Sequence, residues 1–302
     1  MPATQPLRIA VGIATIGRPE IARATIDRLA GQSRRPDRIV VSVPTGADCP
    51  WEPGDTEASP ARIGVTIISG VRGLTCQRNA ILAALFDADI VCFFDDDFVP
   101  HADYLAALEA AFRADPQLVA ATGRVVADGI TGPGYDAAQA ATILRAVAAH
   151  CPAAPVPTYN AYGCNMAFRL AVIRANKLAF DEALPAYGWL EDVDFSRRIA
   201  RHGHLARLDE AVGVHLGVKG GRVSGRRFGY SQIANPLYLV RKGSYAPSRA
   251  AWLMGRNLAM NLLRAPYPEP HIDRRGRVAG NLRAFADLVA GRLHPTRIAA
   301  LA

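Results

Sequence analysis

Short apolar runs alternate with amphipathic stretches along the first two thirds of the chain. The runs are five to nine residues long and rich in β-branched residues, which is typical of buried strands. The stretches between them have helical composition, and Pro19 stands where the first helix would begin. The pattern predicts strands at 8–15, 38–43, 65–69, 89–94 and 118–126, and helices at 20–30, 75–86 and 102–114.

This order of elements indicates the fold class. Strands that alternate with helices form βαβ units with parallel strands. We therefore expect an α/β fold, a mainly parallel sheet flanked by helices. The alternation breaks after Val126, where residues 128–157 are rich in Gly and Pro and are interpreted as an insertion or a mobile flank. Further strands are predicted at 165–169 and 205–208, around a helix at 191–202.

Composition excludes several classes of protein. Half of the 302 residues are apolar and 21% are charged, so the chain is too apolar for a disordered protein. No apolar run reaches the roughly 20 residues that span a bilayer, and the first residues show no signal-peptide pattern, so we expect no export. The five Cys include no C-x-x-C pair, which favours reduced thiols in the cytoplasm over disulfides or a zinc cluster.

The net charge of +8 is unevenly distributed. Residues 1–215 contain 20 Lys and Arg against 24 Asp and Glu, a net charge of −4. Residues 216–302 contain 15 Lys and Arg against 3 Asp and Glu, a net charge of +12. The chain therefore combines a mildly acidic body with a strongly basic C-terminal segment.

Three consecutive carboxylates, Asp95, Asp96 and Asp97, follow directly on the predicted strand 89–94. The carboxyl ends of parallel strands face the ligand crevice, and adjacent carboxylates repel one another unless a cation offsets their charge. Mg²⁺ or Mn²⁺ suits this position, because such ions bind one or two carboxylates and complete their shell with phosphate oxygens and water. A solvated acidic turn or a helix cap would have the same residues.

A second acidic group, Glu191, Asp192 and Asp194, opens the predicted helix 191–202. Acidic residues interact favourably with the dipole at the start of a helix, so helix initiation alone explains them. The apolar residues around the group indicate a packed helix, however. A carboxylate held at its N-terminus would stay ionised at neutral pH, as a general base must.

The order of these motifs resembles that of one family. The chain carries Ala14-Thr15 at the end of the first strand, then Arg78-Asn79, the triplet at 95–97, Gly163-Cys164-Asn165-Met166-Ala167, and Glu191-Asp192. Over roughly residues 7–217 it resembles the family 2 glycosyltransferases, which have the GT-A fold. The order and the spacing of about 95 residues between the two acidic groups carry this resemblance more than any single motif does.

The resemblance implies an inverting glycosyltransferase that moves a sugar from a nucleotide-diphosphate donor to an acceptor hydroxyl. The setting it implies is cell-surface or exopolysaccharide assembly on a lipid-linked glycan acceptor. A GT-A catalytic domain would cover 1–217, with a Rossmann-like nucleotide-binding half at about 7–126 and an acceptor half at about 127–217. A basic Gly-rich loop and an amphipathic helical tail would follow at 218–302.

The same resemblance assigns roles to individual residues. Asp192 would be the catalytic base and Glu191 would position it or the acceptor, while Asp97 would hold the metal ion, Mn²⁺ or Mg²⁺. Members of the family often carry an acidic residue just after the second strand to read the nucleobase. The first acid after that strand is Asp48 here, and the identity of the base is left open. The donor-binding residues implied are Ala14, Thr15, Arg78, Asp95, Asp96 and Asn165.

His215 ends the apolar run AVGVH and is followed by a segment of interleaved glycines and cations. An isolated His of this kind simply finishes an edge strand, but in GT-A enzymes a His at this point can complete the metal shell. In the segment after it, Lys219 and Arg222 suit a diphosphate. We expect a lid that closes over the donor and excludes water, with a flexible basic linker as the alternative.

The tail at 228–302 is predicted to form basic amphipathic helices. One helix would carry Leu282, Phe285, Val289 and Leu293 on a single face, and another would carry Trp252 near its start. This favours peripheral binding to the anionic inner face of the plasma membrane, and packing against the catalytic domain or another copy of the chain is the alternative. Nucleic acid is not expected as a partner, since no aromatic-interleaved platform is present. The oligomeric state is open.

Two other functions share part of this pattern. A nucleotidyltransferase would also combine a nucleotide-binding sheet with metal-binding carboxylates, but the loop after the first strand, TIGRPE, lacks the Gly-rich basic pattern such enzymes usually show. A non-catalytic sugar- or nucleotide-binding protein would be expected to lose one of the acidic groups, and both are present.

Overall fold

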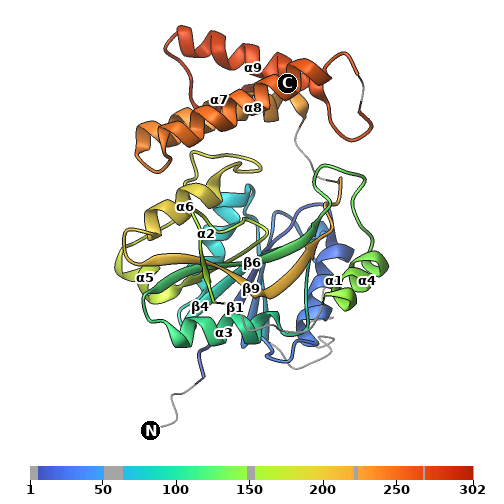
Figure 1. The fold of residues 1–302 in the computed structure, drawn as a ribbon, viewed down its shortest axis with the longest axis vertical. Coiled ribbons are helices and arrows are strands. Elements are labelled where there is room, and N and C mark those ends of the chain that lie inside the picture. Colours follow the sequence, from blue (N-terminus) through green and yellow to red (C-terminus); the bar gives the residue numbers. More distant parts are fainter. Residues whose placement is uncertain (1–5, 51–63, 148–153, 221–223, 268, 302) are drawn as a thin grey trace.

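A computed structural model of the chain describes residues 6–50, 64–147, 154–220, 224–267 and 269–301 (Figure 1). The strands are β1 (Ile9–Ala14), β2 (Arg38–Val43), β3 (Gly64–Ser69), β4 (Ile90–Asp95), β5 (Phe98–Pro100), β6 (Leu118–Asp128), β7 (Val156–Pro157), β8 (Asn165–Arg169) and β9 (His204–His215). The α-helices are α1 (Pro19–Ala30), α2 (Leu74–Ala84), α3 (Tyr104–Ala114), α4 (Ala137–Ala146), α5 (Leu170–Ala175), α6 (Glu191–Ile199), α7 (Gly225–Lys242), α8 (Pro247–Arg264) and α9 (Arg274–Val289). Short 3-10 helices lie at η1 (Gly46–Asp48) and η3 (Pro295–Ala300).

One nine-stranded sheet forms the centre of the molecule. Its order is β3-β2-β1-β4-β8-β6-β9-β5, with β7 paired to β9. The strands β3, β2, β1 and β4 run parallel, as do β6 and β9. β8 lies antiparallel between β4 and β6, and β5 lies antiparallel to β9. The predicted α/β fold with a mainly parallel sheet flanked by helices is confirmed, and the antiparallel strands are additions to it.

Helices cover both faces of the sheet (Figure 1). Apolar residues of α1 and α3, such as Ile26 and Phe112, belong to the core on one face. Residues of α2, α5 and α6, such as Ile81 and Phe195, belong to the core on the other. Because both faces are covered, strands such as β1 are apolar at nearly every position, which is how the sequence revealed them.

The carboxyl ends of the central strands meet at one edge of the sheet. β1 and β4 pair in register so that Ala14 lies opposite Asp95. A tight turn then leads from β4 into β5, and β5 pairs with the end of β9, which places His215 opposite Phe98. Strand pairing therefore brings His215, far away in the sequence, beside the acidic turn.

The described part of the segment at 128–157 includes a helix between its Gly-rich and Pro-rich ends. It contains α4, whose first turn is closed by a capping box in which the Asp136 side chain accepts from the amide of Gln139. The residues 148–153 lie outside the described ranges, as do 51–63 of the predicted loop at 44–62. The predicted helix 191–202 ends at Ile199, and the predicted strand 205–208 is the first part of the longer β9.

The helices α7, α8 and α9 pack together at one end of the molecule, drawn in orange and red in Figure 1. Tyr230, Ile233 and Ala284 contribute to a core that these helices share. Ser224 caps the start of α7, where its hydroxyl accepts from the amide of Arg227, and Gly243 caps the end in the left-handed conformation. Among the described helices, none has the length and apolar character to cross a membrane.

α7 also holds the segment that leads into α6. Lys242 Nζ lies 2.5 Å from a carboxylate oxygen of Asp181 and 2.9 Å from one of Asp194. The Ser244 hydroxyl donates to Asp194 at 2.6 Å, and Leu239 packs in the same cluster as Leu190. The tail therefore packs on the rest of the protein through α7. Such packing is the alternative to membrane binding given above for the whole tail.

The predicted apolar face of α9 points the other way. Leu282 is 64% exposed and Val289 is 91% exposed, whereas Leu293, beyond the end of α9, is buried in the shared core. α9 packs through small and polar residues instead, namely Gly280, Asn281, Ala284 and Asp287. Its apolar face is consequently left uncovered.

Candidate functional site

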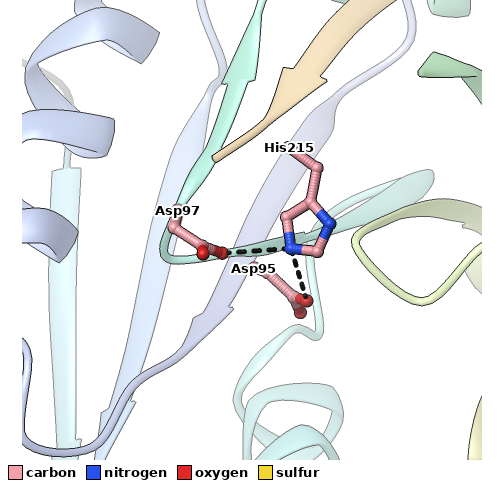
Figure 2. A group of neighbouring side chains, drawn as sticks. All are labelled: Asp95, Asp97 and His215. Carbon is pink, nitrogen blue, oxygen red and sulfur yellow. Dashed lines mark ion pairs between the residues drawn. The ribbon is translucent and has the colours of Figure 1, made fainter. Parts of the chain in front are cut away.

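Asp95, Asp97 and His215 form a compact group at the carboxyl edge of the sheet (Figure 2). One possible ligand atom from each residue lies within 4.8 Å of the others. His215 Nε2 is 3.3 Å from Asp97 Oδ1 and 4.0 Å from Asp95 Oδ2. Two carboxylates and an imidazole are a donor set that suits Mn²⁺, and carboxylates alone suit Mg²⁺. The residues present therefore fit a divalent ion on the chemistry of the donor set.

Asp128, at the end of β6, stands behind His215. Its Oδ1 lies 3.0 Å from His215 Nδ1, and its Oδ2 accepts a hydrogen bond from the Tyr162 hydroxyl at 2.7 Å. Burial alone would lower the pKa of His215, but the carboxylates of Asp128, Asp97 and Asp95 raise it to about 10. The pairing with Nδ1 turns Nε2 toward the other two carboxylates, which is the orientation a metal ligand needs.

Asp96 faces away from this group, toward the loop after β1. The Thr15 hydroxyl donates to its carboxylate at 2.6 Å, and Arg18 Nη2 lies 2.7 Å from the other oxygen. Burial raises the pKa of Asp96 to about 7, against the opposing charge of Arg18. Asp96 therefore ties the β1 loop to the acidic turn, beside the predicted metal ligand Asp97.

Glu191 and Asp192 open α6 after a constrained turn. Leu190, which precedes them, has a φ of 75°, a conformation that a residue with a side chain rarely adopts. Glu191 is buried, whereas Asp192 is half-buried and accepts hydrogen bonds from the amides of Gly163 at 3.1 Å and Val193 at 2.8 Å. Of the two carboxylates, Asp192 is thus the one with access to a bound molecule.

Arg78 connects the two acidic groups. This fully buried guanidinium pairs with Glu191, lies 3.2 Å from Asp95 Oδ1, and donates to the carbonyl of Gly163 at 2.9 Å. The two groups, about 95 residues apart in the sequence, consequently share one environment. The half-exposed Tyr187 belongs to it as well, because burial and the charges of Asp95, Glu191 and Asp192 raise the pKa of its hydroxyl.

The electrostatics of Asp192 differ from the expectation for a helix N-terminus. Burial raises the pKa of its carboxyl above the ordinary value, and the nearby charge of Asp95 adds to this. The hydrogen bonds from Val193 and Gly163 and the charge of Arg78 oppose the shift without cancelling it. Burial also raises the pKa of Glu191 to about 8. The site therefore holds more negative charge than its own cations neutralise.

The other residues predicted to bind the sugar donor differ in how close they lie to the two acidic groups. Ala14 and Thr15 end β1 beside the acidic turn. Asn165 lies in β8 with its side chain fully buried, where its amide pairs with the Thr122 hydroxyl at 2.5 Å and the Gly123 carbonyl at 3.2 Å. These bonds hold the Asn165 side chain within the sheet.

The start of the predicted lid is fixed to the site. The amide of Val218 donates to Asp97 Oδ2 at 2.8 Å, and Lys219 Nζ donates to the Gly129 carbonyl at 2.6 Å. Arg222 lies outside the described residues. Asp48 accepts from the amide of Gly17 at 2.5 Å and from Thr45, so it holds together the loops after β1 and β2.

Sequence reasoning missed Arg18, Asp128 and Tyr162. The sequence does carry a signal for Arg18, since it is a cation in the loop that follows the first strand. Asp128 required the register of β6 against β9, which sets it opposite His215. Tyr162 can be identified only from its contact with Asp128 in the structure, and no local sequence pattern marks either residue.

The fold is shared with enzymes that bind nucleotide sugars. The chain matches the S. aureus TarS 1–349 fragment in complex with UDP-GlcNAc with a TM-score of 0.57 and 13% identity, over 98% of this chain and 84% of that one. It matches the mannosyltransferase PcManGT from Pyrobaculum calidifontis, in complex with GDP-Man and Mn²⁺, with a TM-score of 0.53 and 17% identity, over 98% and 86%.

A longer S. aureus TarS structure matches with a TM-score of 0.53 and 14% identity, over 87% of this chain but only 44% of that one, so the chain spans less than half of its length. No protein-family model matches the chain, and no curated sequence matches it significantly. At these identities the comparisons establish the fold.

Proposed function

We propose that this protein is a metal-dependent, inverting glycosyltransferase that moves a sugar from a nucleotide-diphosphate donor to an acceptor hydroxyl. The observation that carries the proposal is the link through Arg78 between Asp95, a member of the group with Asp97 and His215, and Glu191, which precedes Asp192. A glycosyl transfer needs a cation at the leaving diphosphate and a base at the attacking hydroxyl. The likeness in fold to proteins crystallised with nucleotide sugars supports the same reading.

Asp95, Asp97 and His215 would hold the divalent ion, Mn²⁺ or Mg²⁺. A bound ion of this kind supplies charge that stabilises the diphosphate as its bond to the sugar breaks. The protein residues contribute the positioning. Asp128 keeps Nε2 of His215 aimed at Asp97, and the Val218 amide holds the other oxygen of Asp97. Thr15 and Arg18 brace Asp96, so the turn keeps its shape when the donor binds.

Asp192 would act as the general base. It would accept the proton of the acceptor hydroxyl while that oxygen forms a bond to the anomeric carbon and the bond from this carbon to the diphosphate breaks. Attack opposite the leaving group inverts the anomeric centre and needs no covalent intermediate. The Gly163 amide fixes Asp192 Oδ2, and the pairing of Arg78 with Glu191 holds the start of α6 against the acidic turn.

Thermal-shift measurements test this proposal. UDP, GDP and dTDP are each added with and without Mn²⁺ to the wild type, to Asp97→Ala and to Asp209→Ala, a carboxylate in the middle of β9 that pairs with Arg207. We expect at least one nucleotide to raise the Tm with Mn²⁺ in the wild type and in Asp209→Ala, but not in Asp97→Ala. No shift with any nucleotide would refute the enzyme assignment. If a nucleotide does raise the Tm, a donor screen by mass spectrometry then identifies the sugar.

We further propose that the acceptor is a lipid-linked glycan and that the protein binds the cytoplasmic face of the plasma membrane peripherally. Residues 1–217 would form the catalytic domain and 218–302 the part that meets the membrane. Support comes from the uncovered apolar side chains of the tail, which include Trp252 at 64%, Leu263 at 70% and Val289 at 91% exposure. They are set among the cations that give 216–302 its net charge of +12, which is complementary to anionic lipid.

Co-sedimentation with vesicles tests the membrane assignment. Deletion of the tail is a poor test, because α7 supports the segment before α6 through Asp181 and Asp194. The triple variant Leu282→Ser, Phe285→Ser, Val289→Ser changes only side chains on the outer face of α9. It should sediment less than the wild type with phosphatidylcholine vesicles containing about a third phosphatidylglycerol. Equal sedimentation of both proteins would instead favour a second copy of the chain on this face.

A further inference from the structure

A group of aromatic and basic side chains lies next to the start of α6. The guanidinium carbons of Arg197 and Arg249 lie 4.5 Å and 4.2 Å from the centre of the Tyr159 ring. The Tyr245 ring is 6.3 Å from that of Tyr159, and the amide of Ala246 donates to the Tyr159 hydroxyl at 3.0 Å. These contacts join the beginning of α8 to the segment that runs from β7 to β8.

That segment leads directly to the proposed base. Tyr159 is four residues before Gly163, whose amide binds Asp192, and the amide of Ala161 between them is held by the Ser196 hydroxyl of α6 at 3.0 Å. Burial raises the pKa of Tyr245, the charge of Asp192 raises it further, and the charges of Arg249 and Arg256 lower it. Through the contact of Arg249 with Tyr159, the first turn of α8 is joined to the same segment that holds the proposed base.

The two arginines lack the partners that surface arginines usually have. Among the residues that the structure describes, neither Arg249 nor Arg256 forms an ion pair, and both are exposed. Arg256 stacks over Trp252 at 4.9 Å, and Arg249 stacks over Tyr159. A guanidinium that lies on an aromatic face keeps its N–H edge available, and this edge matches two oxygens of a phosphate.

The spacing along α8 gives this surface a direction. Arg249, Trp252 and Arg256 follow one another at three and four residues, so they lie on one side of the helix. Further along the same side, Leu263 is 70% exposed. The exposed side of α8 thus changes from basic and aromatic, near the base, to apolar at its far end.

We propose that Arg249 and Arg256 form an acceptor subsite for a phosphate or diphosphate group, placed so that the glycan attached to it reaches Asp192. The inference rests on the proposed function and names the chemistry of the acceptor: an anionic, phosphate-linked molecule. A lipid-linked acceptor would lay its chain along the apolar end of α8, whereas a soluble phosphorylated acceptor would use the arginines alone.

Calorimetric titration of the full chain without metal tests the subsite. The probes are inorganic pyrophosphate and a prenyl diphosphate below its micelle concentration. The double variant Arg249→Gln, Arg256→Gln should bind both probes about tenfold or more weakly, since charge-assisted hydrogen bonds of this kind contribute on the order of 1.5–3 kcal/mol. The control Arg241→Gln, Arg264→Gln makes the same charge change at exposed positions and should bind like the wild type.

The two probes separate the sources of the phosphate. Tighter binding of the prenyl diphosphate than of pyrophosphate supports a lipid-linked acceptor, and equal binding supports a soluble one. Binding of both probes that is unchanged in the double variant, or lost equally in the control, overturns the subsite. Nucleotide binding with Mn²⁺ is measured on the same variants and should be unchanged. Loss of that binding in the wild type itself would count against the proposed function rather than against the subsite.

Discussion

Buried carboxylates in two regions of this molecule are balanced in opposite ways. In the helical layer, Asp287 of α9 is surrounded by Arg283, Arg292 and Arg297 and accepts from the Tyr230 hydroxyl at 3.0 Å. At the sheet edge, the carboxylates of Asp95–Asp97, Asp128, Glu191 and Asp192 meet the guanidinium groups of Arg18 and Arg78 and the imidazole of His215. One group has cations in excess, and the other has carboxylates in excess.

The pKa values follow this difference. Burial would raise the pKa of Asp287, but the bonds from Arg297 and Tyr230 and the charge of Arg283 hold it below its ordinary value. Burial raises the pKa of Asp96, Glu191 and Asp192, and their cations do not compensate for it. A balanced group stabilises the fold. A group with an excess of carboxylates lowers the stability of the fold. Such groups are typical of functional sites, where a bound cation offsets the charge or a carboxylate takes part in proton transfer.

The largest effect should come from the base. Asp192→Asn removes the proton acceptor and keeps the size of the side chain, and its single carbonyl oxygen can still accept from one of the two amides, Gly163 or Val193. We expect kcat to fall by about 10²–10⁴-fold, with little change in nucleotide affinity. Single-turnover kinetics and nucleotide titration measure the two quantities separately. A rate within a few-fold of the wild type would remove Asp192 from this role.

Metal affinity should depend on Asp128, whose carboxylate pairs with Nδ1 of His215. Asp128→Asn weakens the hold on Nδ1, and loss of such a partner typically costs about 10–100-fold in metal affinity. Electron paramagnetic resonance titration with Mn²⁺ measures the affinity without any substrate. The matched control is Asp209→Asn, an acid-to-amide change within β9, which should leave the affinity intact. Equal affinity in all three proteins would contradict the positioning by Asp128.

The pH profile should reveal the excess of negative charge. Only the ionised base accepts a proton, so kcat should rise with pH through the pKa of Asp192. Because this pKa is raised, the acid limb should lie above the ordinary carboxyl value of 3.8. Circular dichroism over the same range excludes unfolding, and a limb that lies at or below pH 3.8 would refute the shift.

The smallest effect should be on stability, in the balanced group. Asp287→Asn should lower the Tm by a few degrees at neutral pH, because it removes the charge that three arginines surround. Since the folded-state pKa of Asp287 is depressed, its contribution is present above the unfolded value of 3.8 and is lost as the pH falls through the folded one. The two melting curves should therefore converge at low pH.

A control for that prediction lies at the start of the same helix. Asp273→Asn changes the same charge at the N-cap of α9, where Asn caps as well as Asp does. Its Tm should stay near that of the wild type. A drop as large as that of Asp287→Asn would indicate that the loss of any acid in this basic layer is destabilising, irrespective of its partners.

Apolar runs were enough to predict most of the sheet. β1, β2 and β4 are apolar on both faces, so their positions follow from local composition, and the triplet at 95–97 follows from the end of β4. The strand β5 was not predicted, because three residues after a turn carry no periodic signal. Its pairing with β9 is what brings His215 to the acidic turn, so the metal group needed the resemblance to a family in addition to the pattern.

The helical tail shows where periodicity misleads. The spacing of Leu282, Phe285 and Val289 correctly predicts one apolar face, but spacing cannot tell whether a face is covered. α9 packs through glycine and alanine, which let it approach α7 closely: a Cβ on Gly280 would lie 2.1 Å from the carbonyl oxygen of Arg226. Small residues do not register as a hydrophobic stripe, and so the packed face was invisible in the pattern.

The bonds from Lys242 and Ser244 to Asp194 have a consequence for engineering. They attach the start of α6, which carries the proposed base, to the end of α7, so the residues on the two sides of this boundary hold each other in place. A chimera that exchanges residues 218–302 for those of a relative, in order to alter acceptor choice, must carry the matching partners at 181 and 194. An exchange made without them would remove the support that α7 gives to α6. The resulting loss of activity could then be mistaken for a change in acceptor specificity.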